Sequence, residues 1–225
     1  MNMKPGLSGP SGEAIRKRAV AGLPAAGRSP MGRYRVLGYR LVFRMIGSIS
    51  TLLLAAAGML APSGEEARIA DFLNDYRAAH GLPPIPYSPT LARVAHAHAR
   101  DLEDHNPDSG TDGDGRRCTL HSWSAASGAT PVCYTADHAR AQLMWSKPRE
   151  ITRGAYGGQG FEIAARYSEG IDADIAFDLW RGSAAHNAVI LEQGRWAGTG
   201  WRAMGVALDG RYAVVWFGKV PDPAR

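Results

Sequence analysis

The sequence predicts an α+β domain in which helices cover a mostly antiparallel sheet in an α/β/α layering. Helical periodicity dominates after residue 63, elements of mixed character follow, and the chain closes with a hairpin signal. The apolar and charged fractions, 45% and 21%, are close to those of ordinary globular proteins. A length of 225 residues therefore predicts one globular domain with a tail rather than two full domains.

The basic residues are concentrated at the N-terminal end. Residues 1–63 hold nine of the 26 Lys and Arg but only one of the 21 Asp and Glu. Residues 64–225 therefore carry a formal charge of −3, although the whole chain carries +5. A slightly acidic domain lacks the basic surface that DNA or RNA requires, so we expect no nucleic-acid partner.

Residues 31–63 have the pattern of an export signal, because four arginines precede an uncharged run over residues 45–61. This run is shorter than the roughly 20 residues that span a bilayer, which favours a cleaved signal peptide; a membrane anchor formed by 45–61 is the alternative. Residues 1–30 show no periodicity and predict a disordered extension or a mis-assigned start. We therefore expect residues 64–225 to form a secreted, periplasmic or extracellular domain, with membrane contact only through the N-terminal segment.

Two amphipathic helices open this domain. Ser63 and Glu66 have the spacing of a capping box, and the helix that they begin is expected to end at Gly81. Its apolar residues recur with helical spacing at Ile69, Phe72, Leu73, Tyr76 and Ala79. Ser88 followed by Pro89 predicts the start of a second helix. The buried stripe of that helix comprises Leu91, Val94, Ala95, His98 and Leu102.

Later segments are less regular until the final hairpin. We predict a helix over residues 135–145, and a mostly helical pattern over 171–186 that places Ile175, Leu179 and Trp180 on one side. A glycine-rich connection over residues 154–160 leads into the segment 161–164. Residues 204–208 and 212–217 then read as strands around Asp209-Gly210, which is typical of a two-residue type I′ turn.

The chain has two cysteines, Cys118 and Cys133. In an exported protein they predict a disulfide, which would contribute about 3 kcal/mol by restricting the unfolded chain. A structural zinc site formed by both cysteines with His121 and His138 is the rival interpretation.

Several motifs in this order resemble the CAP superfamily of cysteine-rich secretory, antigen-five and pathogenesis-related proteins. The motifs comprise Phe72-Leu73-Asn74-x-x-Arg77, Leu82-Pro83-Pro84-Ile85, the helix over residues 91–99, Trp180-x-x-Ser183-x-x-His186, and the terminal strands beginning at Gly205 and Tyr212. The resemblance covers residues 66–219 and implies a three-layer α/β/α sandwich with a cleft that contains two histidines and two glutamates.

The resemblance also assigns candidate cleft residues. The two histidines would be His121 and His186, with His105 as a second candidate for the first, and one glutamate would be Glu162. Phe161 interrupts the family's Gly-Glu pair, and the second glutamate has no match, because Ser183 stands three residues after Trp180. The missing second glutamate puts in doubt any activity that requires both histidines and both glutamates. We also expect Trp180, Ser183 and Asn187, which share the motif of His186, to contact a ligand.

Two histidines and one carboxylate permit two kinds of chemistry. They can hold a divalent metal such as zinc, or the carboxylate can orient one imidazole as a general base. A buried hydrogen-bonded network without catalysis is the third interpretation. A further candidate feature is the set of six tryptophans, of which those near residues 194–200 are expected to form a binding rim.

We therefore predict an exported binding or interaction module with a His/Glu cleft. Its ligand is expected to be a metal or a small apolar molecule such as a lipid or sterol, and a cell-surface component is the alternative partner. A metal-assisted protease or esterase using His121, Glu162 and His186, and a structural surface protein, are the alternative functions. Whether the protein is an enzyme, and its oligomeric state, stay open at this stage.

Overall fold

The computed structural model describes residues 62 and 64–223, so the predicted extension over 1–30, the predicted leader up to residue 61, and Ser63 lie outside the described residues. The described elements begin with α1 (Gly64–Ala79) and α2 (Pro89–His105), and continue with α3 (Ala141–Trp145), α4 (Lys147–Ile151), β1 (Gly160–Arg166), α5 (Ala173–Gly182), α6 (Ala184–Ile190), β2 (Ala203–Asp209) and β3 (Tyr212–Gly218). Short 3-10 turns lie at Pro107–Ser109, Ala125–Ser127 and Gly194–Trp196. No helix among the described residues is long and apolar enough to cross a membrane.

The three strands form one antiparallel sheet in the order β1-β3-β2. Strand β3 is central and buried along its whole length, as its Tyr-Ala-Val-Val-Trp-Phe composition predicts. Strand β1 is an edge strand, so one side of it is free to border a cavity.

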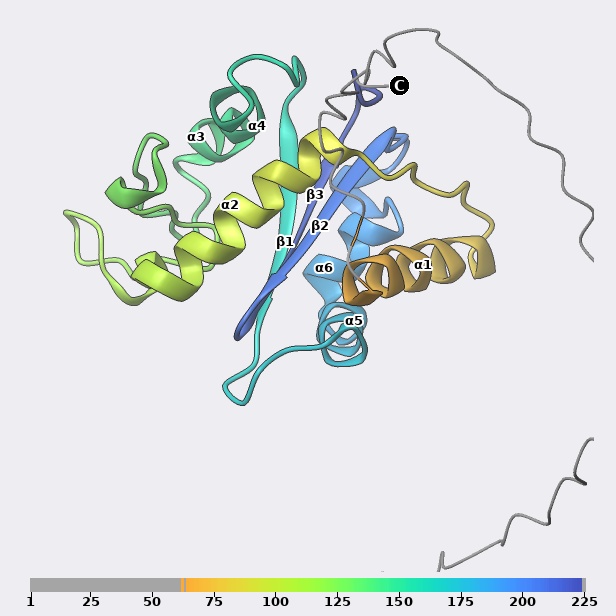
Figure 1. Ribbon diagram of the computed structural model, residues 1–225, viewed down its shortest axis with the longest axis horizontal. Coiled ribbons are helices and arrows are strands. Elements are labelled where there is room, and N and C mark those ends of the chain that lie inside the picture. Colours follow the sequence, from red (N-terminus) through yellow and green to blue (C-terminus); the bar gives the residue numbers. More distant parts are fainter. Residues whose placement is uncertain (1–61, 63, 224–225) are drawn as a thin grey trace, which may run out of the picture. The chain divides into compact units, whose positions relative to one another are not determined.

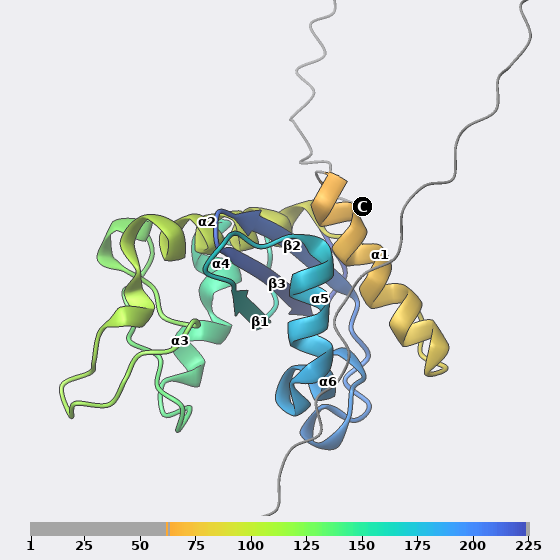
Figure 2. The same ribbon diagram turned by 90° about the horizontal axis from the view of Figure 1, so that it is seen from below.

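Helices cover both faces of the sheet, which confirms the predicted α+β class and three-layer arrangement. One core layer joins α2 and the α3–α4 segment to one face of the sheet, and the other joins α1, α5 and α6 to the opposite face. Figure 1 shows α2, α3 and α4 on one side of the strands and α1, α5 and α6 on the other, and Figure 2 gives the view from below. Because α2 crosses β2 closely at Gly205, a Cβ atom there would lie 2.1 Å from the backbone of Leu91 and Ala92.

The end of the first helix and the start of the second agree with the predictions from the sequence. Gly81, after α1, has a φ of +74°, a conformation that glycine adopts without steric cost. The side chain of Ser88 accepts a hydrogen bond from the Leu91 backbone at 3.0 Å, and Pro89 begins α2. These local signals therefore act as predicted.

Three predictions about the middle and end of the chain need correction. The helix predicted over residues 135–145 forms only over α3, because Asp137 Oδ1 accepts hydrogen bonds from Thr135 and from the Ala139 backbone, and His138 has a φ of +59°. The pattern over 171–186 is broken at Ser183, whose backbone is extended. The buried face of α5 comprises Ala173, Ala176 and Trp180, whereas Leu179 is exposed.

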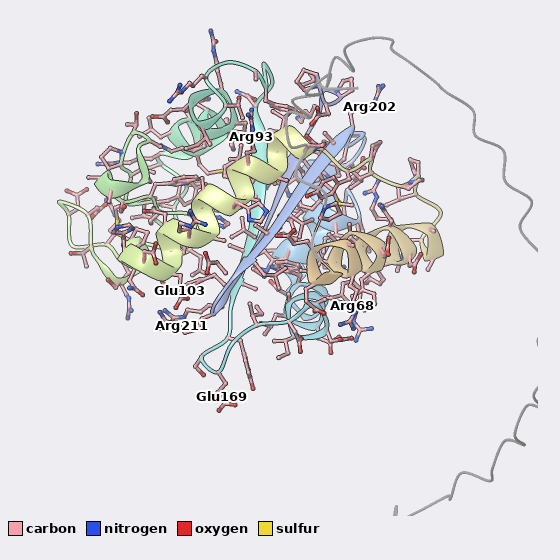
Figure 3. All side chains as sticks on the ribbon, in the orientation of Figure 1. Arg68, Arg93, Glu103, Glu169, Arg202 and Arg211 are labelled. Carbon is pink, nitrogen blue, oxygen red and sulfur yellow. A yellow bond between two sulfur atoms is a disulfide. The ribbon has the colours of Figure 1, made fainter. Side chains whose placement is uncertain are left out.

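The hairpin is confirmed, but its turn lies one residue later than predicted. Asp209 pairs with Tyr212, so Gly210 and Arg211 occupy the two turn positions. Gly210 has a φ of +52°, whereas Arg211 is not in a positive-φ conformation. A type I′ turn needs positive φ at both positions, so this turn is not of that type. Glu103 on α2 accepts a hydrogen bond from the Arg211 backbone at 3.0 Å and thereby fixes the turn against that helix (Figure 3).

Candidate functional site

The centre of the site is Glu162 on the edge strand β1. Alternation along the strand places Phe161 in the core layer of α5 and α6, and Glu162 on the opposite face, in register with Trp216. The Glu162 residue is only 6% exposed. A carboxylate at this depth requires partners for both oxygen atoms, and the structure supplies two histidines.

His98 on α2 is the first partner. Its Nδ1 atom contacts Glu162 Oε1, and its Nε2 atom lies 2.9 Å from the Ser122 carbonyl oxygen. Because both ring nitrogens face oxygen acceptors, both must carry hydrogen, so the hydrogen-bond network indicates an imidazolium beside a carboxylate. The ring also stacks on Trp123 with centroids 4.2 Å apart.

The apolar stripe of the second helix predicts a core position for His98, but it does not predict the contact with Glu162. His98 is fully buried, as its position on the apolar stripe predicts. A buried imidazole needs hydrogen-bond partners, so the sequence predicts that His98 has some. The sequence does not predict which residues they are, because Glu162 lies 64 residues away in the chain.

His121 is the second partner of Glu162. Its Nδ1 atom lies 2.7 Å from Glu162 Oε2, so Nδ1–H donates to the carboxylate. Among the described residues no hydrogen bond to its Nε2 atom is found. His121 therefore has one ring nitrogen fixed by Glu162, and its side chain lines a cavity.

The loop that carries His121 is closed by the predicted disulfide. Cys118 and Cys133 are bonded, with Cα atoms 4.9 Å apart. Because both sulfur atoms are used in this bond, the rival zinc site with His121 and His138 is wrong. His138 instead bonds the Tyr134 hydroxyl through Nδ1, at 2.9 Å.

The charge state of Glu162 results from opposing effects. Burial alone raises the pKa of the Glu162 carboxyl, but the positive charge of His98 and the hydrogen bonds from His121 and His98 outweigh burial and hold this pKa below its ordinary value. Glu162 is therefore a carboxylate that is already neutralised by its own partners.

His186 on α6 lines the same cavity but has no hydrogen-bond partner for its ring among the described residues. Burial and, to a smaller extent, the nearby His121 lower the pKa of His186, and Glu162 opposes them, so that the pKa is about 4. At neutral pH His186 is therefore a neutral imidazole. The structure thus brings His121, Glu162 and His186 to one cavity wall.

The cavity lies beside the free edge of β1, where the two helical layers meet, and has a volume of about 480 Å³. Its wall combines aromatic and aliphatic side chains with several polar groups, and none of the described Ser, Thr or Cys residues contributes to it. The lining residues are His121, Tyr134, His138, Ala141, Met144, Trp145, Phe161, Glu162, Ala185, His186, Ala188, Val189, Gln193, Gly194, Arg195 and Trp196. Such a combination is typical of small-molecule sites.

The other predicted ligand contacts lie outside this wall. Trp180 is fully buried in the core, Ser183 is at the break between α5 and α6, and Asn187 is on α6 without lining the cavity. Of the two tryptophans expected at a rim, Trp196 is half-buried and lines the cavity, whereas Trp201 is 3% exposed and belongs to the core.

The predicted zinc set does not fit this arrangement. Within residues 64–223, no group of three or more His, Cys, Asp or Glu side chains is placed so that it could hold a metal ion. Both oxygens of Glu162 are already used by His98 and His121, so the carboxylate is not free to join His186 as a ligand.

The sandwich fold and the His/Glu cavity define a CAP-type domain. The family model for the cysteine-rich secretory protein family, CAP, matches residues 70–195. The chain belongs to this family, as the motif resemblance predicts. No curated protein matches the chain.

Two solved structures of bacterial proteins are similar in fold. One is an extracellular protein containing an SCP domain from Bacillus anthracis, with 22% identity over 69% of this chain and a TM-score of 0.45. The other is a cysteine-rich secretory protein from Staphylococcus aureus, with 15% identity over 69% of this chain and a TM-score of 0.42. The match covers 40% and 38% of those chains, respectively, so this chain spans well under half of their length.

Proposed function

We propose that residues 64–223 form an extracellular binding module whose cavity takes a small apolar molecule. The observation that carries the proposal is the 480 Å³ cavity with an aromatic and aliphatic wall. Its volume lies in the range of about 300–1,000 Å³ that small-molecule sites occupy. Family membership and the export signal predicted for residues 31–63 support the extracellular location.

The wall is well suited to a flat or branched apolar body. Phe161 contacts Trp145 with ring centroids 5.7 Å apart and Trp196 at 5.3 Å, so three aromatic rings form one continuous surface. Burial of apolar surface at such a wall contributes about 25 cal/mol per Å² removed from water. His121 and His186 then supply the polar groups that would orient one end of the ligand.

The test is binding of a neutral fluorescent probe, N-phenyl-1-naphthylamine, to the full chain. Ala188→Trp should fill part of the cavity and weaken binding at least tenfold, because Ala188 lines the wall. Ala78→Trp is the matched control, because Ala78 is exposed on α1 and does not line the cavity. Equal probe affinity in wild type and Ala188→Trp would contradict the proposal.

A hydrolase is the second candidate, favoured by the His121–Glu162 pair. The carboxylate holds Nδ1–H, which leaves Nε2 as the atom that can accept a proton. Because no Ser, Thr or Cys lines the cavity, water would be the nucleophile. Turnover of nitrophenyl esters and peptides that is lost in a folded His121→Gln variant would support this function, and a complete lack of turnover in the wild type would reject it.

A further inference from the structure

One cation of the cavity wall has no charged partner. Arg195, in the 3-10 turn Gly194–Trp196, is exposed and makes no ion pair with any carboxylate among the described residues. Its charge acts on another wall residue, because burial and Glu162 raise the pKa of Tyr134 whereas Arg195 opposes that shift. Arg195 therefore lines the cavity without a neutralising carboxylate among the described residues.

The rest of the wall offers no free negative charge. Glu162 is its one carboxylate, and both oxygens of Glu162 are bonded to His98 and His121. His138 is bonded to Tyr134, and the His186 ring has no hydrogen-bond partner among the described residues. The cavity thus presents an unpaired cation and the neutral imidazole of His186 beside an apolar surface.

Building on the proposed function, we infer that the apolar ligand of this cavity is an organic monocarboxylate. Its carboxylate pairs with Arg195, and its apolar body lies against Phe161 and Trp196. A planar guanidinium binds a carboxylate through two parallel hydrogen bonds. Arg195 has no such partner within the described residues, so a ligand carboxylate can supply it.

Binding of a carboxylate should be linked to proton uptake. The charge of His186 is influenced by His121 and Glu162, and the other titratable or charged side chains of the same wall are Tyr134, His138 and Arg195. A ligand carboxylate adds a negative charge to this set and favours protonation of His186. Affinity should therefore increase as pH falls from about 7 towards 5.

Two probes of equal shape test the inference on the full chain: 2-naphthylacetate and its neutral amide, 2-naphthylacetamide. At pH 6 we expect the carboxylate to bind about tenfold more tightly than the amide, the ratio that one charge-assisted hydrogen bond produces. Calorimetry in two buffers of different ionisation enthalpy should show proton uptake with the carboxylate and none with the amide.

Arg195→Gln should remove the preference for the carboxylate, so that the acid and the amide then bind with similar affinity. Arg202→Gln is the matched control, because Arg202 is exposed at the start of β2 and does not line the cavity (Figure 3). The control should keep the tenfold preference.

The outcomes separate this inference from the proposed function. Equal binding of both probes, with both blocked by Ala188→Trp, would overturn the carboxylate inference and leave the apolar site intact. Binding of neither probe, or binding that Ala188→Trp does not weaken, would contradict both. A carboxylate preference that persists in Arg195→Gln would overturn the role of Arg195.

Discussion

The Nδ1 atom of His121 lies 2.7 Å from Oε2 of Glu162, although 41 residues separate them in the chain. Glu162 comes from an edge strand and His121 from a disulfide-closed loop. On the other oxygen of the carboxylate, His98 arrives from α2. Glu162 therefore connects the sheet, a helix and a loop at one buried point, and it orients the histidine that lines the cavity.

We predict that Glu162→Gln lowers the free energy of unfolding by about 3 kcal/mol at pH 7, because it leaves the buried His98 without its carboxylate. Urea unfolding measures the change. Glu169→Gln is the control, since Glu169 is exposed in the turn after β1 (Figure 3). A loss for Glu162→Gln within about 0.5 kcal/mol of the control would contradict the paired-carboxylate interpretation.

The same variant should change the acid stability. The pKa of Glu162 is held below its ordinary value of 4.5, so its contribution is fully present above that pH and is lost as pH falls through the lowered pKa. We expect wild type to lose stability more steeply than Glu162→Gln below about pH 4.5. Acid unfolding of both proteins can be followed by circular dichroism. If wild type and Glu162→Gln lose stability equally steeply, Glu162 is not the source of the acid sensitivity.

His186 should affect stability over a higher pH range. Its pKa in the folded protein is about 4, whereas the ordinary value is 6.5, so between these values the unfolded chain binds more protons. Stability should thus fall as pH decreases from 6.5 to 4, by up to about 3 kcal/mol from this group. His186→Gln should make the fall shallower, and exposed His80→Gln is the control. Urea unfolding at several pH values measures the slopes, and identical slopes in wild type and His186→Gln would reject this prediction.

The disulfide should stabilise the loop of His121. Replacing both Cys118 and Cys133 by serine removes a cross-link between residues 15 apart, which predicts a loss of about 3 kcal/mol. Urea unfolding with and without reductant checks this: reductant should destabilise wild type and leave the double variant unchanged. If reductant affects both equally, the stabilisation has another source.

A buried ion pair holds the loop that carries Arg195 and Trp196. The Arg77 Nη2 atom on α1 lies 2.8 Å from Glu192 Oε1, with side chains 1% and 8% exposed, and Glu192 Oε2 also accepts from the Gly200 backbone at 2.6 Å. We predict that Arg77→Met costs about 4 kcal/mol, because it leaves Glu192 buried without its cation. It should also weaken naphthylamine binding.

The exposed pair of Arg68 and Glu65 provides the comparison for Arg77. Its atoms lie 3.0 Å apart, but both side chains are more than 40% exposed. Arg68→Met should cost much less free energy of unfolding than Arg77→Met in the same urea experiment, because water screens the exposed pair. Equal losses for Arg68→Met and Arg77→Met would show that burial does not set the strength of the Arg77 pair.

Local signals in the sequence were sufficient where short-range interactions decide the structure. The Ser88-Pro89 helix start and the residues of the central strand β3 follow from capping and burial preferences that act within a few residues. Residues 135–140 were predicted wrongly because the side chain of Asp137 competes with the helical backbone hydrogen bonds, a competition that apolar periodicity does not detect.

By itself, the sequence determined the α+β class, the first two helices, the disulfide and the three residues expected at the cleft. Only the tertiary structure decided that His98 is bonded to Glu162, that Trp180 is core, and that Arg195 lines the cavity without a charged partner. The physical reason is the separation along the chain of the interacting residues. Helix starts and strand burial depend on neighbours in the chain, whereas the partners of a buried charge come from distant segments that only folding brings together.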